Sequence, residues 1–235
     1  MDNDQIHIKL EGVQSSLEIL HGKAPDPIKP KAILVNGTID APLLFLEKRL
    51  PDLKNAHILV DREAMSILLI TEENVEYFNQ IKGSLKMTDE FKSWLINEGS
   101  TWNHRELALF IKLHRANFEN RDMAIKLSDQ LQNLKVKAEK ILEDEADKKG
   151  NRKILIQQII KEMNLPESFT ILLPIFKGGK KVKLEVEIYI NADDYSCALV
   201  SPDAAESVRT TRDDTIDEVL TKIKDIKPEL VIMEV

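Results

Sequence analysis

Side chains that commonly bind metals or act as nucleophiles are few and widely spaced in this sequence. The chain has one cysteine, Cys197, and five histidines. His104 and His114 are expected on one helix, but ten residues span almost three turns, so one ion cannot bind both. We therefore expect no metal, no cofactor and no catalytic residue, and we assign Cys197 to the core as a small residue. The histidines are His7, His21, His57, His104 and His114.

Four lysines surround a pair of glycines between residues 177 and 183. The backbone N–H groups of the glycines could approach a phosphate, to which the lysines would add positive charge. A lysine-rich turn is more commonly a solubilised hairpin tip that protects a strand edge, and we favour this interpretation. The candidate binding residues are Lys177, Gly178, Gly179, Lys180, Lys181 and Lys183.

Carboxylates form a second cluster between residues 143 and 147. Such a cluster can bind a cation or imitate the phosphates of a nucleic acid, although a solvated turn is its commoner role. The candidate acidic patch consists of Glu143, Asp144, Glu145 and Asp147.

An indole, an amide, an imidazole and a guanidinium follow one another after Thr101. This varied group looks exposed, and Trp102, His104 and Arg105 are candidates for a binding surface. The simpler interpretation, which we prefer, is a helix N-terminus with an aromatic side chain packed against its first turn.

The element expected to position the lysines is a β-hairpin between Leu165 and Asn191. Apolar residues recur at every second position in both arms, which is the period of a strand. The two glycines between the arms tolerate the positive φ angles of a tight turn. We expect the arms, residues 169–176 and 181–191, to pair antiparallel in the central sheet. The residues expected to face water or a partner are Lys181, Lys183, Glu185, Glu187 and Tyr189.

Shorter strands and several helices are expected on both sides of this hairpin. The fold class is α+β: a largely antiparallel sheet, made of a meander and the long central hairpin, with helices packed on one face. Capping and periodicity predict helices starting near residues 38, 88, 100 and 120, with another at 215–226. The predicted strands are 32–35, 57–60, 66–70, 77–87, 195–200 and 230–233, of which 57–60, 66–70 and 77–87 form the meander.

Two alternatives stay open for residues 134–164. The stretch is rich in helix formers, which favours a helical hairpin, yet Ile154, Ile156 and Ile160 suit a strand as well. A turn at residues 148–151 is compatible with both.

The first 30 residues are expected to form an arm separate from the body of the protein. A short amphipathic helix is predicted within residues 6–21, and three prolines between Lys23 and Pro30 indicate an extended linker. Residues 31–235 are expected to form a single α+β domain, with residues 120–165 as the candidate internal boundary.

The composition is that of an ordinary soluble globular protein. The 235 residues carry a net charge of -7, and 5% of them are aromatic. The acidity argues against a broad surface for nucleic acid or membrane, although a local basic patch is compatible with it. A single cysteine suits a reducing compartment, and no apolar run reaches the roughly 18 residues of a membrane span, so we expect a cytoplasmic protein.

Four stretches carry a family resemblance: KAILVNGTIDAPLLFLEKRL, AHILVDREAMSILLI, FKSWLINEGSTWNHRELALFI and PESFTILLPIFKGGKKVKLEVEIYI. In this order they resemble a family of bacteriophage and prophage proteins named only as domain of unknown function 2303, over roughly residues 30–225. The resemblance implies a phage or prophage origin in a bacterial host. It also implies strands in residues 134–163, turning at Lys149-Gly150-Asn151. It implies no activity and carries over no catalytic residue.

The function expected from these observations is that of a non-enzymatic protein that binds a protein partner or assembles with itself, so a homo-oligomer is expected. One alternative is a nucleic-acid-binding factor in phage replication or recombination, which would use the lysine hairpin with Arg105, Arg115 and Arg121. The net charge disfavours it. The other alternative is an inhibitor of a host defence system or nuclease that presents the acidic patch.

Overall fold

A computed structural model describes residues 32–49, 55–71, 78–136, 161, 164–191 and 194–235. Contacts divide the chain into Met1–Lys31 and Ala32–Val235, and all of the described residues belong to the second unit. Three predictions concern residues outside the described ones: the helix within residues 6–21, the acidic patch at 143–147 and the alternatives for most of 134–164.

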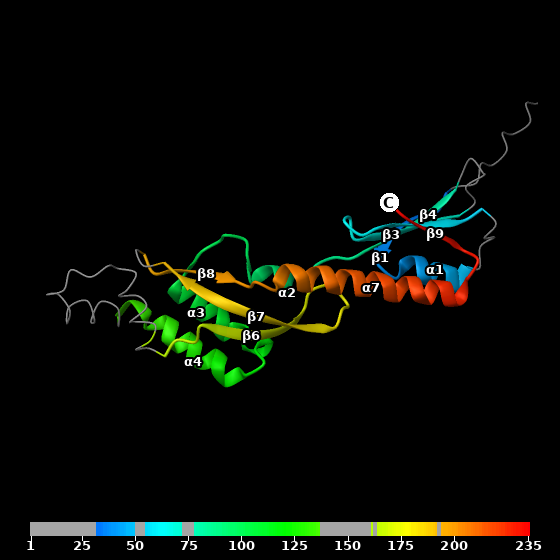
Figure 1. Ribbon diagram of the computed structural model, residues 1–235. Coiled ribbons are helices and arrows are strands. Elements are labelled where there is room, and N and C mark those ends of the chain that lie inside the picture. The colour runs from blue at the N-terminus through cyan, green and yellow to red at the C-terminus, as the bar shows by residue number, and fades with distance from the viewer. Residues whose placement is uncertain (1–31, 50–54, 72–77, 137–160, 162–163, 192–193) are drawn as a thin grey trace, which may run out of the picture. The chain divides into compact units, whose positions relative to one another are not determined.

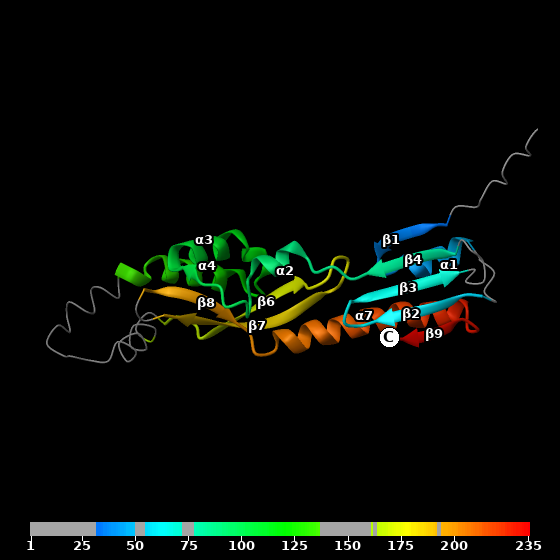
Figure 2. The ribbon, with the colours of Figure 1, turned by 90° about the horizontal axis from the view of Figure 1, so that it is seen from above.

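The α+β class is confirmed, because the described residues form helices and two mostly antiparallel sheets. The first sheet has the order β1-β4-β3-β2-β9, and Figure 2 shows these strands side by side. β2, β3 and β4 form the predicted antiparallel meander, whereas the edge strands β1 and β9 pair parallel to β4 and β2. The bounds are β1 (Leu34–Thr38), β2 (His57–Asp61), β3 (Ser66–Thr71), β4 (Asn79–Ser84) and β9 (Val231–Glu234).

The second sheet has the order β5-β8-β7-β6 and is antiparallel throughout. The predicted hairpin is confirmed in it, with Ile171 of one arm opposite Leu184 of the other. The expectation of one central sheet was wrong, since the meander and the hairpin belong to different sheets. The strands are β5 (Trp102–Asn103), β6 (Ser168–Pro174), β7 (Lys181–Ile190) and β8 (Ser196–Val200).

Each sheet has helices on one face. α1 (Ala41–Arg49) and α7 (Ala204–Ile226) lie on the same side of the first sheet, as Figure 1 shows. The second sheet packs against the segment that contains α2 (Asp89–Ser93), α3 (His104–Leu113), the 3₁₀ helix η1 (Arg115–Asn117) and α4 (Arg121–Gln132). None of the described helices has the length and apolar character needed to cross a membrane.

The two sheets have separate hydrophobic cores, and the hairpin contributes to both. Phe169, Ile171 and Leu173 are buried with Trp94 and the helices of the second sheet. Two residues further along the same arm, Ile175 and Phe176 are buried in the core of the first sheet. The second arm does the same, since Leu184 and Val186 belong to one core and Val182 packs against the other.

Backbone hydrogen bonds hold the end of the hairpin against the segment that joins β4 to α2. The N–H of Thr88 donates to the carbonyl of Ile175 at 2.9 Å, and the N–H of Lys177 donates to the carbonyl of Lys86 at 2.8 Å. The hydroxyl of Thr88 also donates to the carbonyl of Pro174 at 2.7 Å. The tip of the hairpin is therefore fixed by backbone contacts as well as by burial.

The capping signal predicted the start of α2 correctly, whereas the end of α2 and the start of α7 differ from the prediction. Thr88 caps α2 as predicted, because its hydroxyl accepts a hydrogen bond from the N–H of Phe91 at 3.0 Å. The predicted helix to residue 99 ends early, since Leu95 and Asn97 have positive φ angles. α7, in contrast, begins eleven residues before the predicted start, where few apolar residues mark its inner face.

One ion-pair network joins the turn between β2 and β3 to β9 and to α7. The guanidinium of Arg62, in the turn between β2 and β3, donates to both carboxylate oxygens of Glu234 and to Asp217 at 2.7 Å. Its second amine reaches Asp213 at 3.4 Å. These bonds lower the pKa of Glu234 below its usual value. The network therefore attaches β9 and α7 to the meander.

The alternation along β7 predicts very different losses of stability for substitutions at neighbouring positions. Leu184 is 1% exposed, whereas the side chain of Lys183 is 64% exposed. Leu184→Asp should lower the free energy of unfolding by several kcal/mol, because it buries an unpaired carboxylate. Lys183→Gln should change it by about 0.5 kcal/mol or less. Urea unfolding of both variants tests this, and equal losses would mean that buried and exposed positions do not alternate along β7.

Candidate functional site

A cavity of about 590 Å³ lies beside the tip of the hairpin and contains part of the predicted lysine site. Its walls come from the tip, from the turn before α1 and from the middle of α7. Ile39, Leu85, Phe176 and Val219 give it an apolar side. The candidate residues that line it are Lys177, Gly178, Gly179 and Lys180, while Lys181 and Lys183 lie on β7 outside it.

Carboxylates accompany most of the lysines of this region. Lys177 pairs with Asp89 at 3.2 Å, and Lys183 pairs with Glu119. Within the cavity, Lys222 of α7 pairs with Glu218 at 2.8 Å. That bond, with a smaller contribution from Lys180, lowers the pKa of Glu218. The positive charges of Lys177, Lys183 and Lys222 are therefore balanced by neighbouring acids.

The backbone of the glycine pair is used by the turn itself. Gly178 has a φ of +80°, the left-handed conformation for which glycine was expected here. The N–H of Gly179 donates to the carbonyl of Phe176 at 3.0 Å. A side chain on Gly179 would bring its Cβ to 3.0 Å from the same carbonyl oxygen, which requires a shift. The glycines thus have a structural reason that needs no phosphate.

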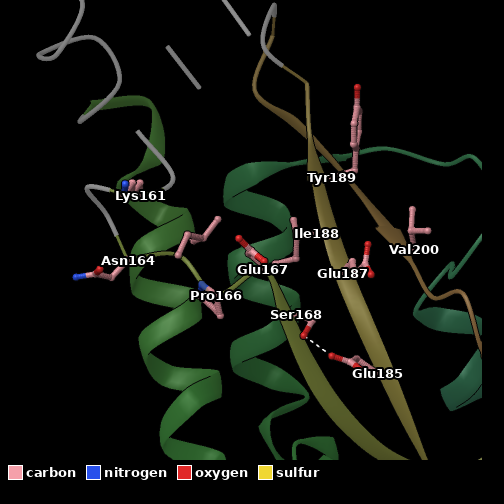
Figure 3. Close-up of a pocket in the computed structure, with 11 residues that line it drawn as sticks. Lys161, Asn164, Pro166, Glu167, Ser168, Glu185, Glu187, Ile188, Tyr189 and Val200 are labelled. Carbon is pink, nitrogen blue, oxygen red and sulfur yellow. Dashed lines mark hydrogen bonds between the residues drawn. The ribbon is translucent and has the colours of Figure 1, made fainter. Parts of the chain in front are cut away.

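A larger groove, of about 1120 Å³, runs along the hairpin and the residues that precede β6. In Figure 3, Ser168 and Glu185 lie at one end, joined by a hydrogen bond of 2.5 Å, and Tyr189 lies at the other. Glu167 and Glu187 add two more carboxylates to its wall. The groove could attract a cation, but in the described part of the chain no three His, Cys, Asp or Glu side chains are arranged to hold a metal ion.

The candidates Trp102, His104 and Arg105 do not form one surface. Asn103 caps α3 by accepting a hydrogen bond from the N–H of Arg105 at 2.9 Å, so the preferred interpretation as a helix N-terminus is correct. Trp102 is half-buried against Phe110, with ring centroids 4.8 Å apart. Arg105 is exposed, whereas His104 is 5% exposed. The expectation that the group is exposed was therefore wrong for His104.

His104 is buried because helical periodicity places it on the inner side of α3, in line with Leu107, Ala108 and Ile111. Neither ring nitrogen has a hydrogen-bond partner among the described residues. Burial lowers the pKa of His104, and the positive charges of Arg105 and Lys135 lower it further. The imidazole is thus a neutral part of the core.

Cys197 is also a core residue, as predicted. It is fully buried in β8, opposite Trp102 of β5. Burial raises the pKa of its thiol to about 12, so the unreactive thiol form dominates at neutral pH.

A surface that was not predicted lies on the first sheet, on the face opposite α1 and α7. Ile58 and Leu69 are paired and fully buried on the helix side, so the next pair, Leu59 and Leu68, points to the other side. We call this side the open face. Its apolar residues, partly buried or exposed, are Leu34, Leu59, Leu68, Ile70, Val231 and Met233.

The open face differs sharply from the corresponding face of the second sheet. There, β7 presents alternating exposed residues that are mostly charged, as predicted, and this is the usual pattern for a sheet face in water. Runs of consecutive apolar residues in the meander, Ile58–Val60 and Ile67–Ile70, were the signal that β2 and β3 present apolar residues on both faces of the sheet. The charged residues of β7 are Lys181, Lys183, Glu185 and Glu187.

Comparison with known proteins finds no matching family model, no matching curated protein and no matching solved structure. What the chain can do is therefore argued from its own surfaces.

The buried imidazole of His104 predicts a pH dependence of stability. In the unfolded chain the imidazole binds a proton near pH 6.5, while in the folded protein its lowered pKa keeps it neutral to a lower pH. The unfolded state then binds more protons, so stability falls as the pH falls below about 6.5, by up to about 1.4 kcal/mol per pH unit.

His104→Leu should therefore reduce the loss of stability between pH 7 and pH 5 (the window set by the ordinary histidine pKa). Urea unfolding of the variant and of the unchanged protein at both pH values measures the difference, in which the other histidines cancel. An identical pH dependence for both proteins would show that His104 is protonated in the folded state.

Proposed function

We propose that the protein acts by binding proteins, including copies of itself, rather than by catalysing a reaction, and that the open face of the first sheet is its working surface. The observation that carries this proposal is the exposure of large apolar side chains on that face: 70% for Leu34, 56% for Val231 and 41% for Met233. Val231 and Met233 of the edge strand β9 adjoin the half-buried Leu59, Leu68 and Ile70. On the other side, Gln80 and Lys82 of β4 lie between these residues and Leu34.

Covering this surface would be favourable. Removal of apolar surface from water contributes about 25 cal/mol per Å², so a side chain that becomes fully covered contributes about 1.5 kcal/mol or more. Contiguous apolar patches on soluble proteins commonly mark sites of interaction. The contrast with the charged outer face of β7 supports the same conclusion, because both surfaces belong to one chain with one solvent.

The nucleic-acid alternative gains no support from the lysine hairpin. Lys177 and Lys183 are paired with acids, and the N–H of Gly179 is already donated within the turn. Counterion release, the main source of backbone affinity, requires lysines that are free to neutralise phosphates. The inhibitor alternative depends on the acidic patch at residues 143–147, which lies outside the described residues.

The setting of this function is proposed from the sequence. The resemblance to the bacteriophage family favours an accessory protein encoded by a phage or prophage, and the composition favours the bacterial cytoplasm. In that setting a protein that assembles through an apolar sheet surface would bind proteins of the phage or of the host.

The test compares exposed positions on the two sheet faces. Met233→Glu on the open face should weaken association about tenfold, because about 1.4 kcal/mol of apolar contact is lost and a charge must be desolvated. Tyr189→Glu on β7 is the matched control, since Tyr189 is 65% exposed on the other sheet and should leave association unchanged. Sedimentation equilibrium over a range of concentrations gives the association constants.

The proposal is contradicted if the unchanged protein stays at its monomer mass of 26.8 kDa at every concentration and binds no protein through this face. It is also contradicted if both variants associate as the unchanged protein does.

A further inference from the structure

The four sheet edges of the described structure are not equally protected against pairing. The edge of β6 is covered, because Phe118 bridges to Ile171 and the N–H of Glu119 donates to the carbonyl of Thr170 at 3.2 Å. β5 has two residues, which is too short to add a strand. β9 carries Glu234, whose charge is held at the edge by Arg62.

β1 has none of these protections. Its five residues, Leu34–Thr38, include no charged residue and no proline, and four of them are exposed. An uncharged exposed edge is a template for pairing with another strand.

The pairing register of β1 with β4 shows which backbone groups of β1 are free to pair with another strand. Ile33 accepts a hydrogen bond from the N–H of Gln80 on β4, so its backbone faces inward.

Because the backbone direction alternates along a strand, the N–H and C=O groups of Leu34 and Asn36 face away from β4. None of the other described strands pairs with β1. These groups can therefore form the ladder of a new strand pair.

We propose that β1 pairs antiparallel with β1 of a second copy of this chain, about a two-fold axis at Asn36. This inference rests on the proposed function, since it names the partner and the geometry for the same sheet. The axis places Asn36 opposite its own counterpart and Leu34 opposite Thr38 of the other copy. Two five-stranded sheets then form one continuous ten-stranded sheet, and the pairing is closed and self-complementary.

A second copy fits this edge because the outward-facing backbone groups lie symmetrically about Asn36, so two copies present matching donors and acceptors with no charge between them. The chain has a net charge of -7, so most contacts between two copies would bring like charges together. The β1 edge avoids this repulsion because Leu34–Thr38 carries no charge. The pairing also places both open faces on the same side, with Asn36, Gln80 and Lys82 of each copy between their apolar residues.

The helices leave room for this pairing. α1 packs mainly on β4, on the face opposite the open face, and Leu43 and Leu46 are buried there. Strands lie about 4.8 Å apart, so the two β4 strands of the pair would be roughly 14 Å apart. Two helices need about 10 Å, and the α1 helices of the two copies therefore fit side by side.

Thiol cross-linking tests the register. Native Cys197 is fully buried and gives no background. In the proposed pair, the Cα atoms of residue 36 lie roughly 5.5 Å apart, whereas those of residue 34 lie roughly 14 Å apart. A short bismaleimide should therefore link Asn36→Cys to itself in high yield and should not link Leu34→Cys to itself. It should link a mixture of Leu34→Cys and Thr38→Cys, which stand opposite each other.

A proline variant provides an independent measurement. Asn36→Pro removes an N–H that faces outward, so the ladder between β1 and β4 loses no hydrogen bond. The variant should keep the circular dichroism of the unchanged protein and should lose the β1-paired dimer of twice 26.8 kDa, so its average mass should be lower at the same concentration, while association through the open face remains.

The outcomes separate this inference from the proposed function. If Asn36→Cys does not cross-link while the unchanged protein still associates through a contact sensitive to Met233→Glu, the β1 pairing is wrong and the proposed function stands. If Leu34→Cys links to itself as well as Asn36→Cys does, the antiparallel register is wrong. If Asn36→Cys links as expected but Met233→Glu has no effect, the pairing stands and the open face is not the working surface.

Discussion

Burial of Ile175 and Phe176 in the core of the first sheet is the constraint on which the rest of the structure depends. The same hairpin arm buries Phe169, Ile171 and Leu173 in the core of the second sheet. One continuous arm therefore belongs to two cores, and the segment from Lys86 to Thr88 is hydrogen-bonded along it. The turn is further fixed by the ion pair of Lys177 with Asp89 and by the hydrogen bond from the N–H of Gly179 to the carbonyl of Phe176.

The two sheets use their surfaces differently as a consequence. Each has helices on one face, and among the described residues no helix packs on the other face (Figure 1). The second sheet presents the charged residues of β7, a stable arrangement in water. The first sheet presents Leu34, Val231 and Met233, together with an edge strand that carries no charge. This difference is the basis on which we propose the first sheet, and not the lysine hairpin, as the interacting surface.

Features that depend on neighbours in the sequence were predictable, and features that depend on distant contacts were not. The alternation of the hairpin arms and the caps at Thr88 and Asn120 are local, and the structure contains them. The parallel pairing of β1 and β9 and the separation into two sheets depend on contacts across much of the chain. Arg62 illustrates the same limit, because its partner Glu234 lies 172 residues away.

The same distinction between local and distant contacts applies to the candidate site. The position of the lysines on a hairpin tip was correct, but their pairing with Asp89 and Glu119 required the fold. The predicted exposure of His104 is wrong because its polar neighbours in the sequence lie on other sides of the helix, which places His104 with Leu107 and Ile111. The apolar open face had a signal in the run Ile67–Ile70, yet only the sheet shows that no described helix packs on it.

The central claim is that the protein binds its partner through the first sheet and that the edge strand β1 pairs with the partner. Hydrogen exchange of the backbone amides tests it most directly, because Leu34 and Asn36 direct their N–H groups away from β4. Exchange at these two amides should be fast in dilute solution and should slow markedly at high protein concentration, while the amides of β7 exchange at the same rate in both. Fast exchange at Leu34 and Asn36 at every concentration would contradict the account.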